Sequence, residues 1–224
     1  MFPFRVLQMK SAKIFIAIIL ITNFIGSAFA SEINSNLKPF VMVDVSKEKD
    51  ADTSTSKLAN EYINANLTLG VKTPEKMESS IKFSQSQKDN NYISSTSRLS
   101  TLSSGLEVKV KKSIEITSGL YPYVSVRLGH KINSQKTYSD VKSFTYYALD
   151  LGTKISFADN WAVDLGVRLR DAHDQDYQSL RYHSTLLYDL NRSNTLGLRY
   201  STSSSDNNTT EKRKGIRLHW QHNY

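Results

Sequence analysis

The feature of this sequence that most constrains its fold is the alternation of apolar and polar residues, clearest over Trp161–Arg170 (WAVDLGVRLR). Successive side chains of a β-strand point to opposite sides. One face would therefore carry Trp161, Val163, Leu165, Val167 and Leu169, and the other Ala162, Asp164, Gly166, Arg168 and Arg170. A strand of this kind fits either a soluble β-sandwich with its apolar face in a core or a transmembrane barrel with that face in lipid.

The N-terminus has the three parts of a secretory signal peptide. It is basic at Arg5, Lys10 and Lys13, apolar over Ile14–Gly26, and has small residues up to Ala30. The apolar run is shorter than the roughly 20 residues that a membrane-spanning helix needs. We therefore expect residues 1–30 to be a signal peptide cleaved near Ala30, and residues 31–224 to form one outer-membrane β-barrel domain. An uncleaved anchor is the alternative.

The chain contains no cysteine, so the exported domain cannot rely on disulfides. The formal net charge of the full chain is +8. Its mean hydropathy is only −0.42. That value is compatible with a membrane barrel, because alternating strands average apolar and polar faces.

Alternating segments recur along the whole chain. We expect strands near 40–46, 58–71, 77–86, 106–111, 120–129, 143–155, 161–170, 177–190, 195–201 and 216–221. Pro122 indicates a strand end or a bulge. Long polar connections are expected near 47–57, 87–104, 130–142, 171–176 and 202–213, and short turns near 72–76, 112–119, 157–160 and 191–194.

Long loops at one end and short turns at the other are typical of outer-membrane barrels. The sequence therefore predicts an all-β fold, a transmembrane antiparallel β-barrel of about ten strands (range 8–12), with both termini at the turn end. The apolar faces of the second half are almost free of charge, and segments of about ten residues suit tilted spanning strands. A periplasmic β-sandwich is the alternative.

The last strand has apolar residues at Ile216, Leu218, Trp220 and Tyr224. This ending resembles the C-terminal assembly signal of bacterial outer-membrane barrels. The resemblance implies the outer membrane as location, its lipid as surroundings, and the barrel assembly machinery as a partner that recognises the strand ending in Tyr224.

With the apolar faces outward, basic residues outnumber acidic ones in the lumen. We expect an anion path lined by Lys109, Arg127, Lys154, Arg168, Arg170, Arg181, Arg199 and Arg217, with Lys82 and Lys111 also inward. Facing them would be Asp44, Glu78, Glu107, Asp150, Asp164 and Asp189. Rings of Arg and Lys favour anions in pores. The sequence thus indicates a channel for passive uptake of small anionic solutes such as acidic oligosaccharides.

Two non-conducting alternatives remain open. Arg–Asp pairs could fill a narrow barrel, as side chains do in small barrels. The protein could also be a surface barrel that acts in adhesion or in envelope structure, with its Ser-, Asn- and Thr-rich loops exposed.

The motifs YVSVRLGH (Tyr123–His130) and VDLGVRLRDA (Val163–Ala172), together with the alternating loop lengths, resemble the small oligogalacturonate-specific porin family. The resemblance covers most of the mature chain. It implies a monomeric barrel with a basic lumen that takes up oligouronides. The family is expected to have twelve strands, whereas ten are indicated here.

No enzyme, metal, cofactor or nucleic-acid signature stands out. His183 and Ser184 are neighbours in sequence and must face opposite sides of a strand, so they cannot form a nucleophile–base pair. His183 and Asp189 share a face but lie about 20 Å apart along it. The segment AHDQD (Ala172–Asp176) reads as solvated loop, since its acidic residues lack the calcium-loop spacing. The basic residues are spread over separate strands and do not form a nucleic-acid patch.

Overall fold

The computed structural model describes residues 36–50, 61–89, 100–135, 141–172, 177–207 and 209–224. The expected signal peptide, residues 1–30, lies outside this part of the chain, as do His173, Asp174 and Asp176. Ten strands are present: β1 (Lys38–Asp50), β2 (Glu61–Lys72), β3 (Met77–Asp89), β4 (Ser100–Ser113), β5 (Leu120–Gln135), β6 (Val141–Ala158), β7 (Trp161–Ala172), β8 (Tyr177–Asp189), β9 (Asn194–Asn207) and β10 (Thr209–Asn223). Over these ranges no helix has the length and apolarity to cross a membrane.

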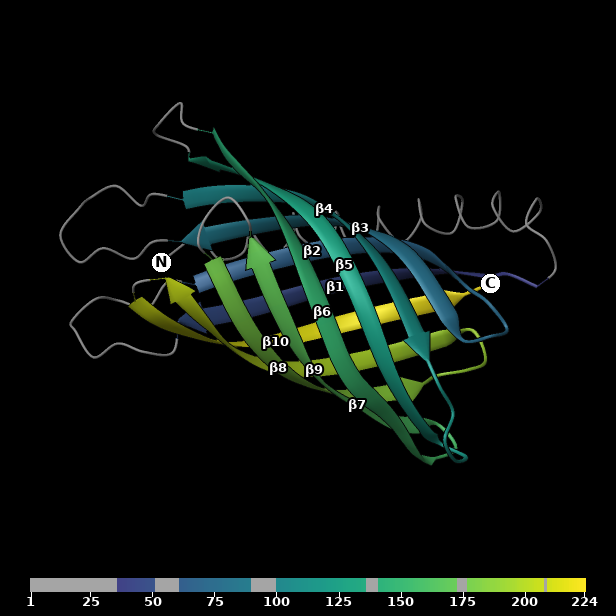
Figure 1. Ribbon diagram of the computed structural model, residues 1–224. Coiled ribbons are helices and arrows are strands. Elements are labelled where there is room, and N and C mark those ends of the chain that lie inside the picture. Colours follow the sequence, from purple (N-terminus) through teal and green to yellow (C-terminus); the bar gives the residue numbers. More distant parts are fainter. Residues whose placement is uncertain (1–35, 51–60, 90–99, 136–140, 173–176, 208) are drawn as a thin grey trace, which may run out of the picture.

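The strands form one closed antiparallel barrel, in which each strand pairs with its neighbours in sequence and β1 pairs with β10 (Figure 1). The β1–β10 ladder is continuous from Phe40↔Asn223 to Asp50↔Arg213. The prediction of about ten strands is confirmed. The short connections at 73–76, 114–119, 159–160 and 190–193 lie at the same end of the barrel as the C-terminus (Figure 1).

The predicted alternation sorts side chains between the two surfaces of the wall. Outward-facing residues are mostly large and apolar, and many stay exposed, such as Leu128 at 60% and Ile216 at 59%. The inner face is polar: the largest fully buried side chains among the described residues are Glu107, Thr185, Asp44 and Asp150. This reverses the arrangement of a soluble sandwich, in which the apolar face would be buried. An apolar outer wall around a polar interior is the arrangement of a barrel in lipid.

Aromatic residues gather on the outer wall at the turn end. The Trp161 ring lies 4.6 Å from that of Tyr188, and the rings of Trp220, His222 and Tyr224 follow one another along the end of β10. Trp220 Nε1 donates to Asn194 Oδ1 at 3.2 Å. Rings with an apolar body and a polar tip suit the boundary between lipid and water, so this end marks one membrane interface.

The short turns are built as their sequences predict. Asn191 Oδ1 accepts hydrogen bonds from the backbone N–H groups of Ser193 (3.0 Å) and Asn194 (2.9 Å), which closes an Asx turn. Gly119, in the turn after β4, has a φ of 87° that a residue with a side chain rarely adopts.

The strands run further than the alternation alone indicates. β1 continues to Asp50, β5 to Gln135 and β9 to Asn207, all within segments predicted as loops. These extensions are rich in Ser, Asn, Lys and Asp, so their composition resembles that of a loop. In these extensions the strands still pair through their backbones, although neither face is apolar. Pro122 neither ends nor bulges a strand: it pairs regularly with Thr153 near the start of β5, and the register shift lies between Ser156 and Ala158.

Inward-facing glycines make room for rings that lie against the wall. Gly166 pairs with His183, and Gly197 with His219, across neighbouring strands. A Cβ at Gly197 would lie 2.0 Å from Cε1 of His219, and one at Gly166 would lie 2.6 Å from Cε1 of His183. Tyr146 covers its partner Gly129 in the same way. Each ring therefore folds over the wall of the barrel because its cross-strand partner has no side chain.

We expect Gly197→Ala to destabilise the barrel by about 1–3 kcal/mol, the usual cost of overpacking, because the new methyl group displaces the His219 ring. Urea-induced unfolding of the protein in lipid vesicles measures this change. Adding His219→Ala should recover most of the loss, since it removes the clash. An equal loss in the single and double variants would contradict the explanation.

Candidate functional site

All eight basic residues of the predicted anion path lie on the inward-facing side of the barrel wall, but they fall into different environments. Lys109, Arg127, Lys154, Arg168, Arg199 and Arg217 line a cavity of about 670 Å³. We call this cavity the vestibule. It runs from residues at the turn end, such as Asn160 and Asn223, to Glu107 and Arg168 deep in the barrel. Arg170 and Arg181 lie beyond it, toward the loop end.

The deep end of the vestibule is formed by a group of buried ion pairs, Lys82, Glu107, Arg127, Asp150 and Arg168, which we call the belt. Glu107 is 2% exposed and Arg168 is 8% exposed. Lys82 and Glu107 are direct cross-strand partners, as are Asp150 and Arg168. The register therefore explains which charges meet.

Arg127 joins the two halves of the belt. Its Nη1 donates to Glu107 Oε1 at 2.6 Å and its Nε to Asp150 Oδ2 at 2.5 Å. Arg168 Nε donates to the other oxygen of Asp150 at 2.5 Å, and Lys82 Nζ lies 2.7 Å from Glu107. Two carboxylates thus bind three cations, which suits the strong charge-assisted bonds that guanidinium groups form.

Two further side chains complete the hydrogen bonding of the belt. Tyr146 donates to Glu107 Oε2 at 2.8 Å, and Ser125 donates to Asp150 Oδ2 at 2.7 Å. Buried charges are costly unless they are paired and hydrogen-bonded, and both carboxylates here meet that condition. The belt is therefore a fully bonded constriction between the vestibule and the loop-side half of the lumen.

The vestibule has a surplus of positive charge. Ten basic and six acidic residues line it. Lys82, Lys109, Arg127, Arg168 and Arg217 pair with carboxylates. The other five form no ion pair with a carboxylate of the described residues: Lys72, Lys111, Lys154, Arg192 and Arg199.

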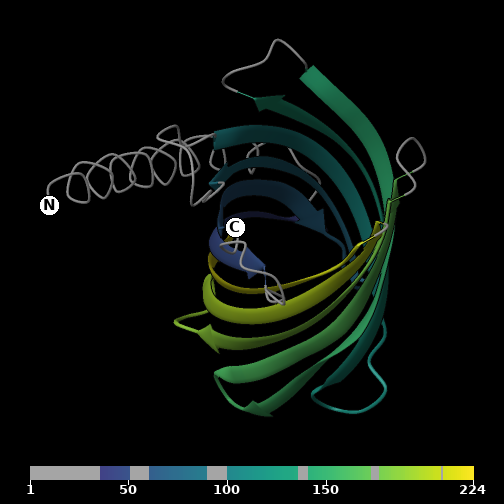
Figure 2. The same cartoon turned by 90° about the vertical axis from the view of Figure 1, so that its left-hand side faces the viewer.

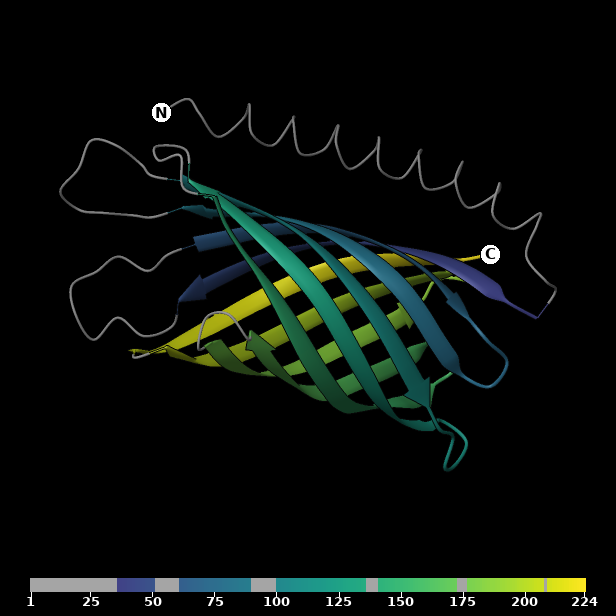
Figure 3. The ribbon, with the colours of Figure 1, turned by 45° about the horizontal axis from the view of Figure 1, so that its top comes forward.

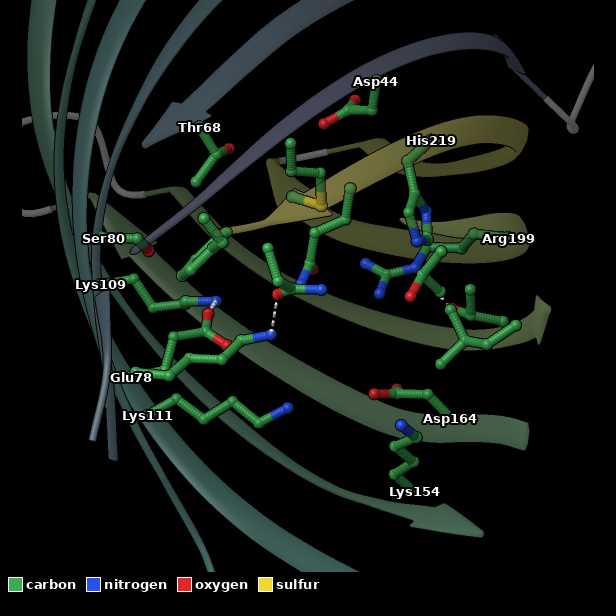
Figure 4. A pocket seen from close by; sticks show the side chains of 18 of the residues that line it. Asp44, Thr68, Glu78, Ser80, Lys109, Lys111, Lys154, Asp164, Arg199 and His219 are labelled. Atoms are coloured by element: carbon green, nitrogen blue, oxygen red, sulfur yellow. Dashed lines mark hydrogen bonds and ion pairs between the residues drawn. The ribbon is translucent and has the colours of Figure 1, made fainter. Parts of the chain in front are cut away.

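These five cations come from different parts of the wall. Lys111 Nζ lies 3.7 Å from the centroid of the Tyr123 ring. Arg199 Nε donates to Thr185 Oγ1 at 2.7 Å, and Lys72 Nζ donates to Asn223 Oδ1 at 2.9 Å. Figure 4 shows Lys111 and Arg199 on opposite sides of the vestibule, while Lys109 points toward its partner Glu78. Such groups can bind an anion without first breaking an ion pair.

A buried cluster of Tyr123, Asp164 and His183 adjoins the vestibule. Tyr123 donates its hydroxyl hydrogen to Asp164 Oδ1 at 2.9 Å, and His183 Nε2 lies 3.1 Å from the same oxygen. Sequence reasoning compared His183 with Asp189 on its own strand and missed this partner on β7. The register between β7 and β8 would have revealed this contact, because it pairs Asp164 with Thr185, which is two residues from His183 on the same face. No serine or threonine hydroxyl bonds to His183 in the described ranges.

The loop-side half of the lumen contains two of the predicted path residues. Arg181 pairs bidentately with Glu48, with both N–O distances 3.1 Å. Arg170 has its guanidinium carbon 4.4 Å from the centroid of the Tyr146 ring, and its buried Nε has no hydrogen-bond partner. No group of His, Asp and Glu suited to a metal ion occurs among the described residues.

Solved structures similar to this chain are bacterial outer-membrane barrels. The translocator domain of the autotransporter NalP from Neisseria meningitidis is 6% identical with a TM-score of 0.52, covering 88% of this chain and 92% of that one. The β domain of the Bordetella autotransporter BrkA is 8% identical with a TM-score of 0.52, covering 85% and 100%. No protein-family model matches the chain, and no curated protein matches it.

The similar structures also include the KdgM porin. It is 9% identical, has a TM-score of 0.42, and covers 82% of this chain and 99% of that one. The fold is that of the small outer-membrane β-barrels.

We expect Glu107→Gln to cost about 3–5 kcal/mol of unfolding free energy, because it leaves Lys82 and Arg127 short of a buried negative charge. The matched control is Glu61→Gln. Glu61 also binds two cations, Lys47 at 2.9 Å and Lys49 at 2.7 Å, but at the surface. That change should cost less than about 1 kcal/mol. Urea unfolding in lipid vesicles measures the loss for both variants. Equal losses of unfolding free energy would mean that the buried ion pairs of the belt stabilise the fold no more than surface ion pairs do.

Proposed function

We propose that this protein is an outer-membrane channel for the passive uptake of small anionic solutes, inserted after removal of a signal peptide near Ala30. The apolar outer wall and the likeness of the fold to outer-membrane barrels support the location. The polar, positively charged vestibule supports the preference for anions.

The observation that carries the proposal is the set of five vestibule cations without a carboxylate partner. A cation that is already paired must give up one carboxylate to bind another, which yields little net free energy. Lys111 and Arg199 form no ion pair with a carboxylate of the described residues, and an anion between them would be partly shielded from water. The vestibule therefore favours anions over cations.

The proposed path continues from the vestibule through the belt. At this level an anion would pass by taking the place of a carboxylate on the guanidinium groups of Arg127 and Arg168. Beyond them, Arg170 stacks on Tyr146 and forms no ion pair with a carboxylate in the described part of the chain. A solute arriving from the loop side would thus meet Arg170, then the belt, then Lys111 and Arg199.

The solute would have to be small. A cavity of about 670 Å³ lies within the roughly 300–1,000 Å³ range of small-molecule sites. Acidic oligosaccharides, including oligouronides, are the first solutes to test because of the family resemblance in the sequence. Their hydroxyl groups could bond to Thr68, Ser80 and Gln221, which also line the vestibule.

A second candidate function is a non-conducting surface barrel that acts in adhesion or envelope structure. The belt favours it, because Glu107 and Asp150 are each 2% exposed and their cations fill the interior at that level. Under this proposal the vestibule would be a blind pocket and the loop end the functional surface.

Insertion is proposed to involve the barrel assembly machinery. The strand it would recognise is β10, which closes the barrel against β1 and ends in the Trp220, His222 and Tyr224 rings. The backbone N–H of Tyr224 donates to the carbonyl of Pro39 at 2.9 Å, so the final residue is part of the closure.

We expect the protein to form anion-selective channels of small conductance in planar lipid bilayers. Replacing both Lys111 and Arg199 by Ala should lower the anion-to-cation permeability ratio several-fold, since it removes two uncommitted charges from the path. Digalacturonate added to the bath should reduce the current in the unmodified protein. Reversal potentials in a salt gradient give the ratio directly.

The matched control is Lys214→Ala, which removes a positive charge from the outward face of β10. It should leave the permeability ratio unchanged. Silent bilayers with correctly folded protein would favour the non-conducting barrel. Cation selectivity would contradict the proposed role of the vestibule.

A further inference from the structure

Basic residues on the outer surface of the wall gather where β1 meets β10. Four exposed lysines face outward in the loop-side halves of these two strands, and we call them the seam patch: Lys47, Lys49, Lys212 and Lys214. Over the described residues, the outward faces of β2 to β9 present no Lys or Arg in their loop-side halves. The positive charge of the outer wall at this end is therefore confined to one side of the barrel.

The seam patch begins where the apolar wall ends. Lys47 pairs across the strands with Ile216 on one side and with Ile63 on the other, and both isoleucines are exposed on the apolar wall. The Nζ of Lys47 nevertheless lies 2.9 Å from Oε2 of Glu61, which is nearer the loop end on β2. The side chain thus leans away from the apolar zone, as the side chains of lysines do at a membrane boundary.

The spacing along β10 agrees with this height. The ring of Tyr224 belongs to the aromatic group at the turn end. From Tyr224 to Lys214 the chain advances about 25 Å along the barrel axis, at a rise of about 3.3 Å per residue and a tilt of about 40°. The lipid-facing apolar zone of such barrels is also about 25 Å tall. Lys214 therefore lies at the level of the lipid headgroups on the loop side.

The charges of the seam patch are only partly balanced. Lys49 and Lys214 are direct cross-strand partners, and like charges in that position destabilise a sheet. Glu61 is shared between Lys47 at 2.9 Å and Lys49 at 2.7 Å. Lys212 and Lys214 form no ion pair with a carboxylate among the described side chains. The patch therefore attracts anions.

We propose that the seam patch binds the phosphate headgroup of an anionic lipid in the leaflet on the loop side of the membrane. Lysine ammonium groups are common ligands of phosphate, and basic residues beside a membrane attract anionic lipids. A phosphate between Lys49 and Lys214 would offset their repulsion.

The wall below the patch suits the rest of such a lipid. Val45 and Leu218 are cross-strand partners, and both are exposed, as is Ile216. The acyl chains of a lipid held by its phosphate would lie against these side chains. A free phosphate ion would gain nothing from them. The inference rests on the proposed membrane location and is independent of conduction.

Native mass spectrometry of the folded, detergent-solubilised protein tests the inference. We expect the unmodified protein to retain lipid A, which carries two phosphate groups, in preference to phosphatidylcholine. Replacing both Lys49 and Lys214 by Gln should lower the fraction of chains with bound lipid A at least several-fold, because it removes the two facing charges. Inorganic phosphate at the same concentration should not displace the lipid, since it lacks acyl chains.

The matched control is Lys38→Gln with Lys112→Gln, which removes two exposed lysines from the turn end. This variant should retain lipid A as the unmodified protein does. Equal retention by the two double variants, no preference for lipid A, or displacement by inorganic phosphate would overturn the proposal. Failure of the unmodified protein to insert into phosphatidylcholine vesicles would instead contradict the membrane location itself.

Discussion

The constraint on which the whole structure depends is that a backbone in hydrocarbon must satisfy its N–H and C=O groups by itself. Ten antiparallel strands achieve this only if the last pairs with the first, and the β1–β10 ladder of eleven register pairs does so. Closure then fixes the rest. Every side chain points either to lipid or into one narrow interior, because strands alternate strictly between the two. Figure 3 shows how the strands tilt as they wind around that interior.

This arrangement encloses charged side chains inside the barrel, where an unpaired charge is costly. Charged side chains enclosed by the wall must find partners among residues at the same height on neighbouring strands. The belt does so through direct cross-strand pairs, Lys82 with Glu107 and Asp150 with Arg168, bridged by Arg127. Closer to the turn end the basic residues that line the vestibule outnumber the acidic ones, ten to six. The cations without a carboxylate partner among the described residues, such as Lys111 and Arg199, give the vestibule its surplus of positive charge.

Much of this could be predicted from the sequence, because period-two alternation is a strong signal wherever one face must be apolar. The strand number, the inward direction of Arg127 or Arg199, and the short turn at Asn191–Asn194 all follow from it. The polar extensions of β1, β5 and β9 could not be predicted, since strands outside lipid need no apolar face.

The pairing of charges also escaped prediction. Alternation places His183, Asp164 and Tyr123 inside the barrel, but only the register of three strands brings them together. A shift of one strand by two residues would keep every side chain on its face and change every ion pair that this strand makes with its neighbours. The sequence therefore distinguishes a cationic lumen from an anionic one, and cannot by itself distinguish the paired belt from the unpaired vestibule.

The unequal lengths of the strands have a consequence for what meets the protein from outside. β5 and β6 have 16 and 18 residues, against 12 in β2 and β7. At a rise of about 3.3 Å per residue and a tilt of about 40°, β6 spans roughly 45 Å along the barrel axis. This length exceeds the lipid-facing apolar zone of such barrels, which is about 25 Å tall. Figure 2, seen from the loop end, shows the β5–β6 hairpin standing apart from the other strands at one side of the rim. The β5–β6 ladder therefore continues beyond the apolar wall as a rigid, hydrogen-bonded hairpin.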